Sequence, residues 1–387
     1  MIRRLVGIIA IKKTNIVMTD HLILDGTILL DGDRIVDFGE SGKVNIPEDA
    51  VIIDAEGNYS GPGLIDIHTH AGGGIWFSED PQGASLHHLK HGTTSLLPAL
   101  YFNLNKEQYL DGISRIKSAS TAGNGRIIKG LYMEGPYLNA KFGCDKENNV
   151  WGKKVCFKEY GELIKAAGDF ARVWCIAPER ENIDDFVMNV IKHIPGVIFS
   201  VAHSEASPVQ IEEYIPYGLK LATHHTNATG DLPKYPECRG VCVDETVNFN
   251  DEIYAELICD SKGIHVDPYM LRLVLKIKGK DKIILISDAC VFDGPIPTGY
   301  EGVTDINFDF TGEIAGSKLT LNVACRNMMK HTGASMCDAF NFASYNPARL
   351  LNMKDYGSIE KGNKADIVIV DHLMNVKRVI LSGEVVF

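Results

Sequence analysis

Six histidine and carboxylate residues in this sequence stand where they could bind a metal ion. His68 and His70 are two positions apart in "GLIDIHTH", so on a β-strand both side chains would point to the same side. The other four close separate apolar runs: Glu134 in "LYMEGPY", His203 in "VAHSEA", His224 in "ATHH" and Asp288 in "ISDAC". Imidazole and carboxylate groups are the ligands that Zn²⁺ and Fe²⁺ take up. A histidine pair alone is weak evidence, so the metal interpretation depends on all six residues meeting in space.

The spacing of apolar runs predicts a fold that brings these residues together. Short, nearly continuous apolar runs alternate with segments of helical periodicity, as in a parallel sheet covered by helices. The runs span residues 63–70, 93–99, 127–135, 172–179, 196–204, 218–225, 253–260 and 282–289. Eight such repeats predict a closed (β/α)8 barrel of the TIM type. Catalytic residues of such barrels lie at the carboxyl ends of the strands, where the six residues fall.

Each strand-end residue also has a simpler explanation when it is taken alone. Glu134 could cap a turn, His203 could be a hydrogen-bonded histidine beside a helix start, and Asp288 could be a helix N-cap. His225, next to His224, would point to the opposite face of its strand and pack there. None of these explanations accounts for the recurrence of the same position on five strands.

The two ends of the chain read differently from the middle. Residues 1–58 contain short β-like pieces broken by Asp-Gly pairs, which favour tight hairpin turns. Residues 357–387 return to short strands and glycine turns, and we expect them to pair with the N-terminal strands. We therefore predict a small β-domain from residues 1–58 plus 357–387, and a barrel from residues 59–356.

Charge and composition restrict the possible partners and compartment. The formal net charge of the 387 residues is -11, which argues against nucleic-acid or anionic-membrane binding. No run approaches the roughly 18 apolar residues of a membrane span, and the apolar stretch near the N-terminus is too short for a signal peptide. Nine scattered cysteines without a disulfide framework indicate reduced thiols and a cytoplasmic protein.

The sequence resembles the amidohydrolase superfamily and, within it, the N-acetylglucosamine-6-phosphate deacetylases. The matching segments include "GPGLIDIHTHAGGG", "LYMEGPYLN", "AHSEA", "ATHHTNA", "GIHVD", "ISDA" and "GSIEKGNKADIVIVD", in the family's order. The resemblance implies a (β/α)8 barrel with a small β-sandwich built from both termini, and a homodimer.

The same resemblance implies a metal centre and an activity. Glu134, His203 and His224 would bind one divalent ion, and His68 and His70 a second, completed by Glu134 or Asp288. We thus expect one or two ions per subunit, Zn²⁺ or Fe²⁺ above all. The reaction implied is hydrolysis of the N-acetyl amide of an amino sugar, most of all N-acetylglucosamine 6-phosphate.

The resemblance also assigns roles to the remaining site residues. A metal ion acidifies water and polarises the amide carbonyl. Asp288 would accept a proton from that water and return it to the departing amine. Asn227 and Ala228 would hold the sugar, and His265, which follows the seventh run, would bond a hydroxyl or the phosphate.

Two segments depart from the family pattern. Family members have a Gly-x-His element after the "EGP" strand end, whereas Cys144 and Asp145 stand there in this chain. The family arginine that binds phosphate is also missing in register, although Arg239 and Lys234 lie nearby and either cation could bind phosphate. An unphosphorylated or different N-acyl substrate is therefore the alternative. A non-catalytic scaffold is a weaker one, since a decayed site would not retain all six residues.

Overall fold

The computed structural model describes residues 7–143, 148–230 and 234–387. The chain forms two compact units. Unit 1 contains the residues up to Asp66, His87–Ser95 and Thr320–Phe387, and unit 2 contains Ile67–Leu86 and Leu96–Leu319.

The central element is an eight-stranded sheet whose strands follow one another in chain order. Its strands are β6 (Leu64–Thr69), β9 (Thr93–Tyr101), β10 (Leu131–Glu134), β11 (Ala171–Ile176), β12 (Ile198–Val201), β13 (Leu219–Ala222), β14 (Tyr254–Ile258) and β15 (Ile283–Ile286). The pairs from β9 to β15 are parallel. Just past β15, the backbone N–H of Asp288 donates to the carbonyl oxygen of His68 at 2.9 Å and joins the last strand to the first. The predicted (β/α)8 barrel is confirmed.

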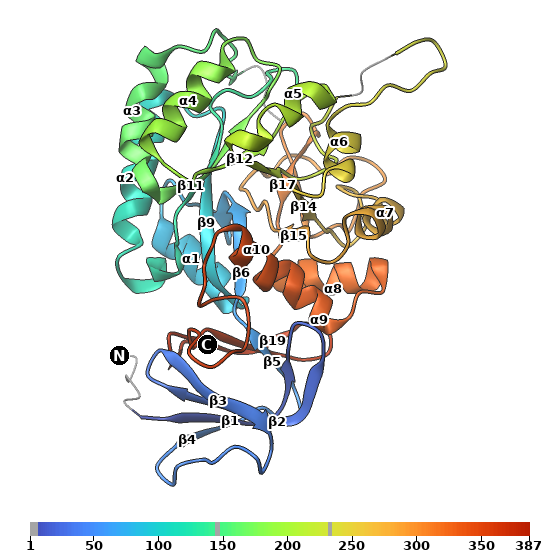
Figure 1. Ribbon diagram of the computed structural model, residues 1–387. Coiled ribbons are helices and arrows are strands. Elements are labelled where there is room, and N and C mark those ends of the chain that lie inside the picture. The colour runs from blue at the N-terminus through green and yellow to red at the C-terminus, as the bar shows by residue number, and fades with distance from the viewer. Residues whose placement is uncertain (1–6, 144–147, 231–233) are drawn as a thin grey trace. The chain divides into compact units, whose positions relative to one another are not determined.

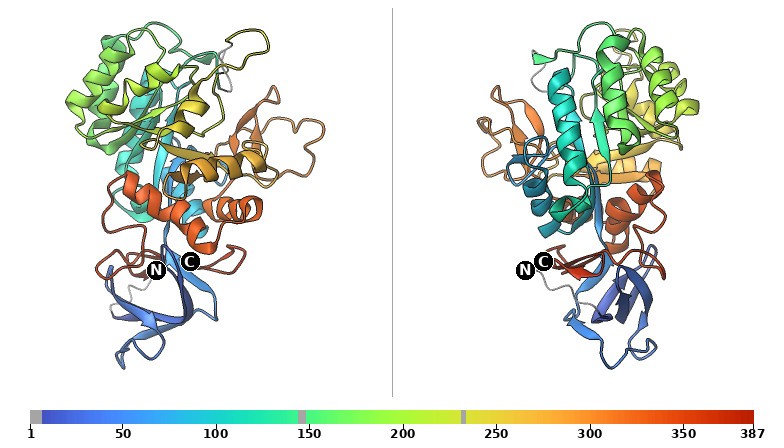
Figure 2. Two further views of the ribbon diagram at one scale, coloured as in Figure 1. Left: turned by 45° about the vertical axis from the view of Figure 1, so that its right-hand side comes forward. Right: turned by 90° about the vertical axis from the view of Figure 1, so that its left-hand side faces the viewer.

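Helices between the strands lie on the outside of this sheet (Figures 1 and 2). They are α1 (Pro81–Lys90), α2 (Lys106–Ala119), α3 (Phe157–Ala167), α4 (Ile183–His193), α5 (Pro208–Glu212), α6 (Val243–Phe249) and α7 (Pro268–Lys278). Helix α2 begins with a capping box, in which the Asn105 side chain accepts from the Gln108 N–H at 2.9 Å and the Gln108 side chain accepts from the Asn105 N–H at 2.8 Å. Two hairpins extend the strand ends: β7 (Ala71–Gly72) with β8 (Ile75–Trp76), and β16 (Ile306–Phe308) with β17 (Ile314–Ser317).

Unit 1 is built around one sheet to which both ends of the chain contribute. The strands are β1 (Ile9–Val17), β2 (Leu22–Asp31), β3 (Arg34–Glu40), β4 (Val51–Asp54), β5 (Tyr59–Pro62), β18 (Ile367–Val370), β19 (Val376–Leu381) and β20 (Glu384–Val385). Strands β18 and β5 pair antiparallel, which confirms that the C-terminal strands join the N-terminal ones. Ile35 on β3 and Ile380 on β19 share one buried cluster although they lie near opposite edges, so the sheet curls around its own core. Unit 1 also contains α8 (Leu321–Thr332), α9 (Met336–Phe340) and α10 (Asn346–Leu350).

No helix among the described residues is long and apolar enough to cross a membrane. The domain boundaries predicted at residues 58/59 and 356/357 stay a prediction.

Candidate metal centre

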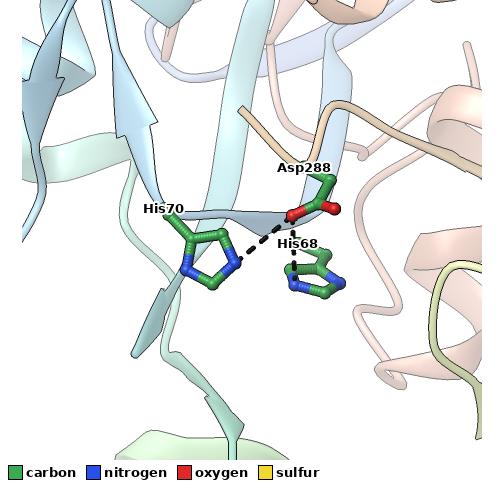
Figure 3. A group of neighbouring side chains, drawn as sticks. All are labelled: His68, His70 and Asp288. Atoms are coloured by element: carbon green, nitrogen blue, oxygen red, sulfur yellow. Dashed lines mark ion pairs between the residues drawn. The ribbon is translucent and has the colours of Figure 1, made fainter. Parts of the chain in front are cut away.

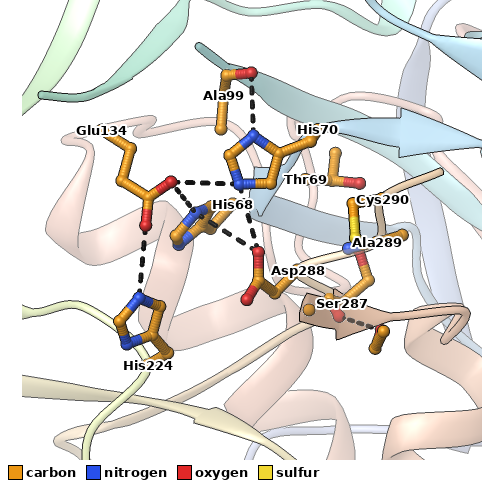
Figure 4. A network of polar contacts seen from close by, with 12 residues as sticks. His68, Thr69, His70, Ala99, Glu134, His224, Ser287, Asp288, Ala289 and Cys290 are labelled. Atoms are coloured by element: carbon orange, nitrogen blue, oxygen red, sulfur yellow. Dashed lines mark hydrogen bonds and ion pairs between the residues drawn. The ribbon is translucent and has the colours of Figure 1, made fainter. Parts of the chain in front are cut away.

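The six strand-end residues converge at one end of the barrel and are all buried. Figure 4 shows five of them, His68, His70, Glu134, His224 and Asp288. The six residues form two groups, within each of which the potential ligand atoms lie no more than 4.8 Å apart. The groups are His68, His70 and Asp288, and Glu134, His203 and His224. Residues up to 220 positions apart in sequence thus meet because parallel strands end at the same edge.

The group of Glu134, His203 and His224, called the first group below, has the dimensions of a metal site. Glu134 Oε1 lies 2.9 Å from His203 Nε2 and 3.2 Å from His224 Nε2, and the two Nε2 atoms are 3.1 Å apart. Ligands at about 2.0–2.1 Å around a tetrahedral Zn²⁺ ion lie roughly 3.3 Å from one another. Three donor atoms with this mutual spacing fit one divalent ion.

The second group, His68, His70 and Asp288, is drawn in Figure 3. Glu134 contacts it as well as the first group (Figure 4). Asp288 Oδ1 is 3.2 Å from His70 Nε2 and 3.6 Å from His68 Nε2. The other oxygen of Glu134, Oε2, is 3.1 Å from His70 Nε2. One carboxylate therefore faces both groups, each with a different oxygen.

Hydrogen bonds behind the cluster orient its imidazole rings. The Nδ1 of His70 donates to the carbonyl oxygen of Ala99 at 3.2 Å, and the Nδ1 of His224 donates to that of Asn227, also at 3.2 Å. A carbonyl oxygen can only accept, so these Nδ1 atoms carry hydrogen and each ring turns its Nε2 toward the cluster. Such partners are typical of metal-binding histidines.

Glu256 orients the imidazole ring of His68 in the same way, and the sequence analysis did not identify it. It is fully buried on β14, and its Oε2 accepts from His68 Nδ1 at 3.1 Å and from the His224 backbone N–H at 3.2 Å. A glutamate inside the apolar run "IYAELICD" was the available signal, because a buried charge in a core strand requires a partner.

We predict that Glu256→Gln weakens metal binding by about 10–100-fold, because the ring of His68 loses its anionic acceptor. Competition against a chromophoric chelator would measure the affinity. The exposed Glu252→Gln, two residues before β14, is the matched control and should bind metal as the wild type does. Unchanged affinity in a folded Glu256→Gln variant would contradict the role of Glu256.

Three of the six residues have an unusual backbone. His203, His224 and Asp288, each two residues after its strand, have φ angles of 42°, 30° and 46°. This left-handed region is disfavoured for residues with a Cβ. The local turn aims each side chain across the barrel mouth.

Electrostatics keep the two carboxylates ionised despite their burial. Burial alone raises the pKa of Glu134, but hydrogen bonds from His203, His224 and the other two histidines outweigh it and hold the pKa well below its usual value. Asp288 behaves alike: burial raises its pKa, and the histidines lower it below the ordinary value. For His70, burial lowers the pKa, but Asp288 and Glu134 raise it to about 9. A cation that binds here must displace such protons.

A cavity of about 350 Å³ opens onto the cluster. Three of the predicted substrate residues, Asn227, Ala228 and His265, line it. His265 is fixed from two sides, with Nδ1 3.1 Å from Asp260 Oδ2 and Nε2 3.2 Å from the Gly316 carbonyl oxygen. Burial raises the pKa of Asp260, but the side chain and backbone of His265 lower it to about 2. Asp260 is thus an ionised anchor for His265.

The predicted phosphate residues lie elsewhere. Arg239 is exposed and donates to Glu245 Oε1 at 2.6 Å, and Lys234 is exposed; neither lines the cavity. Lys141 does line it, with Nζ 2.5 Å from Glu205 Oε2. Cys144 and Asp145 lie outside the described residues.

Comparisons with known proteins match this chain to amidohydrolases and to N-acetylglucosamine-6-phosphate deacetylases. The model of the amidohydrolase family matches residues 251–386. N-acetylglucosamine-6-phosphate deacetylase of Bacillus subtilis (strain 168) is 28% identical over 405 residues, covering 97% of this chain and 96% of that protein. The crystal structure of the enzyme of that name from Pasteurella multocida has a TM-score of 0.84 at 26% identity, covering 98% of this chain and 99% of the other. A Mycobacterium smegmatis mutant of that enzyme, solved in complex with N-acetyl-D-glucosamine-6-phosphate, has a TM-score of 0.81, also at 26% identity, with coverage of 98% and 99%.

Proposed function

We propose that this chain, whose sequence and fold resemble those of the amidohydrolases and of the N-acetylglucosamine-6-phosphate deacetylases among them, is a metal-dependent deacetylase. Its reaction is hydrolysis of N-acetylglucosamine 6-phosphate to glucosamine 6-phosphate and acetate. The observation that carries this proposal is the six-residue cluster at the mouth of the barrel, in a chain that matches such deacetylases over nearly its whole length.

The cluster residues have two roles in amide hydrolysis, binding of the metal ion and proton transfer. A divalent ion bound there would polarise the amide carbonyl and acidify the attacking water. Asp288 is a carboxylate at neutral pH, because its histidine neighbours lower its pKa. It takes a proton from the water and gives it to the amide nitrogen, since an amine is a poor leaving group until it is protonated.

The sugar is held by residues that follow β13 and β14. Asn227 and Ala228 come after His224, and the hydrogen bond from His224 to the Asn227 carbonyl ties this loop to the cluster. His265 lines the cavity with its ring fixed by Asp260, and a hydroxyl or the phosphate would replace the Gly316 carbonyl oxygen as the partner of its Nε2. These contacts position the amide against the cluster.

We propose Arg239 and Lys234 as the phosphate-binding residues. Lys234 is exposed, and an anion would compete with Glu245 for the exposed guanidinium of Arg239. Replacing both with alanine should lower kcat/KM for the phosphosugar by roughly 10-fold or more, since a charge-assisted hydrogen bond contributes about 1.5–3 kcal/mol. Turnover of N-acetylglucosamine should hardly change. Lys141→Ala is the comparison variant: a selective loss there, and none in the double variant, would assign the phosphate to Lys141.

Further properties belong to the same proposal. The ions are Zn²⁺ or Fe²⁺, one or two per subunit, because imidazole and carboxylate ligands suit both. The protein is a cytoplasmic homodimer; the eight described cysteines are free thiols, which suits a reducing compartment. Residues 1–58 with 357–387, and residues 59–356, are its two domains.

Acetate release tests the function directly. Enzyme loaded with Zn²⁺ or Fe²⁺ would be assayed with N-acetylglucosamine 6-phosphate, N-acetylglucosamine, N-acetylgalactosamine and N-acetylgalactosamine 6-phosphate. We expect fast turnover of the first. No turnover of it by metal-replete enzyme would contradict the proposal and direct the search to other N-acyl compounds.

A further inference from the structure

Aromatic side chains line the cavity beside the cluster, and the three that lie on the side of His70 have no part in the mechanism above. Trp76 and Tyr101 stack, with ring centroids 5.8 Å apart and planes 11° apart, and Phe292 meets Trp76 edge-on at 5.7 Å. The His70 ring lies 6.4 Å from that of Trp76 and 5.9 Å from that of Tyr101. We call Trp76, Tyr101 and Phe292 the aromatic wall.

Regular backbone structure fixes most of this wall. Trp76 lies on β8, which pairs with β7 so that Trp76 stands opposite Ala71. The N–H of Phe77 donates to the carbonyl oxygen of His70 at 3.0 Å, which returns the hairpin to the strand end that carries His70. Tyr101 ends β9. Side chains fixed on strands make a pocket of defined shape.

The wall and the proposed sugar residues belong to different strands of the barrel. Asn227 and Ala228 follow β13, and His265 follows β14. In the wall, Phe292 follows β15, Trp76 lies on the hairpin after β6, and Tyr101 is the last residue of β9. A trans amide is planar and directs the acyl carbon and the nitrogen substituent in opposite directions. With the carbonyl at the cluster and the sugar beside Asn227, the acyl carbon points away from the sugar residues.

We infer that the aromatic wall binds the acyl group of the substrate and that Trp76 limits the length of this group. The inference rests on the proposed function and deepens it, since it names short N-acyl amides as the substrate class. An apolar, half-buried wall beside His70 suits a methyl group. A longer acyl chain meets the Trp76 ring.

The experiment compares N-acetyl, N-propionyl and N-butyryl glucosamine 6-phosphate. One methylene in an apolar pocket changes kcat/KM by about 10–200-fold. The metal-loaded wild type should therefore have a kcat/KM for the acetyl amide at least about tenfold higher than for the butyryl amide. In Trp76→Ala the butyryl-to-acetyl ratio of kcat/KM should rise about tenfold or more, and Trp76→Phe should be intermediate.

Control variants and metal analysis separate the possible results. Phe249→Ala, an exposed aromatic outside the cavity, should keep the wild-type ratio. Metal content would be measured in every variant, because Trp76 contacts His70. An equal loss on all three amides, or an unchanged ratio in Trp76→Ala with wild-type metal content, would overturn the acyl assignment alone. If the metal-loaded wild type hydrolyses none of the three, the proposed function falls, and the inference with it.

Discussion

Replacing Asp288 with asparagine is expected to lower kcat for amide hydrolysis by about 10²–10⁴-fold, the contribution typical of a positioned general acid and base. Asparagine has the size of aspartate but cannot accept the proton of the attacking water. Asp288 is suited to that role by its position, because it is buried at the cluster with Oδ1 3.2 Å from His70 Nε2. Steady-state kinetics on N-acetylglucosamine 6-phosphate would measure the loss.

Metal content distinguishes this effect from a damaged cluster. The four histidines and Glu134 remain in the variant, so we expect metal bound per subunit to stay at the wild-type value in elemental analysis. Asp293→Asn, an exposed substitution in the loop that follows, should keep wild-type kinetics. An Asp288→Asn variant with wild-type kcat would exclude Asp288 as the general base.

The second large effect is expected from Glu134→Gln. Its two carboxylate oxygens face different groups, with Oε1 2.9 Å from His203 Nε2 and Oε2 3.1 Å from His70 Nε2. Glutamine removes the negative charge and turns an NH₂ group toward histidine nitrogens. Removing a residue that only hydrogen-bonds to a metal ligand weakens metal binding by about 10–100-fold. Glu134 faces the metal site directly, so we expect its substitution to lower the metal affinity by more than about 100-fold.

Activity should fall together with the metal. Lewis-acid stabilisation is worth several kcal/mol, so kcat/KM should drop by about 10³-fold or more. Chelator treatment of the wild type should cause a similar loss that added Zn²⁺ or Fe²⁺ reverses. Glu162→Gln, on the exposed surface of α3, is the matched control. A Glu134→Gln variant that retains metal and turnover would rule out the shared carboxylate.

The position of the six cluster residues could be predicted from sequence because a single rule governs them. In a parallel barrel all strands end at the same mouth. A residue that closes an apolar run in the sequence can therefore be placed at that mouth. His68 and Asp288 come together in this way although 220 positions separate them. The helices could also be predicted from sequence, since segments of helical periodicity separate the apolar runs.

Contacts made by loops and hairpins after the strands could not be predicted in this way. Trp76 reaches His70 only because β7 and β8 fold back, and no periodicity carries that information. Phe292 lies in the irregular segment after β15, so its contact with Trp76 depends on tertiary structure alone. The exposure of Arg239 likewise depends on a loop path that its neighbours in sequence do not specify.

The left-handed backbone at His203, His224 and Asp288 has a consequence for the history of such a site. Each of these residues costs the fold about 1 kcal/mol or more relative to glycine in the same conformation. A glycine in place of His203 or His224 would relieve this strain but would remove a partner of the buried Glu134 carboxylate, which is strongly destabilising. The strained turns and the cluster can therefore be lost only together.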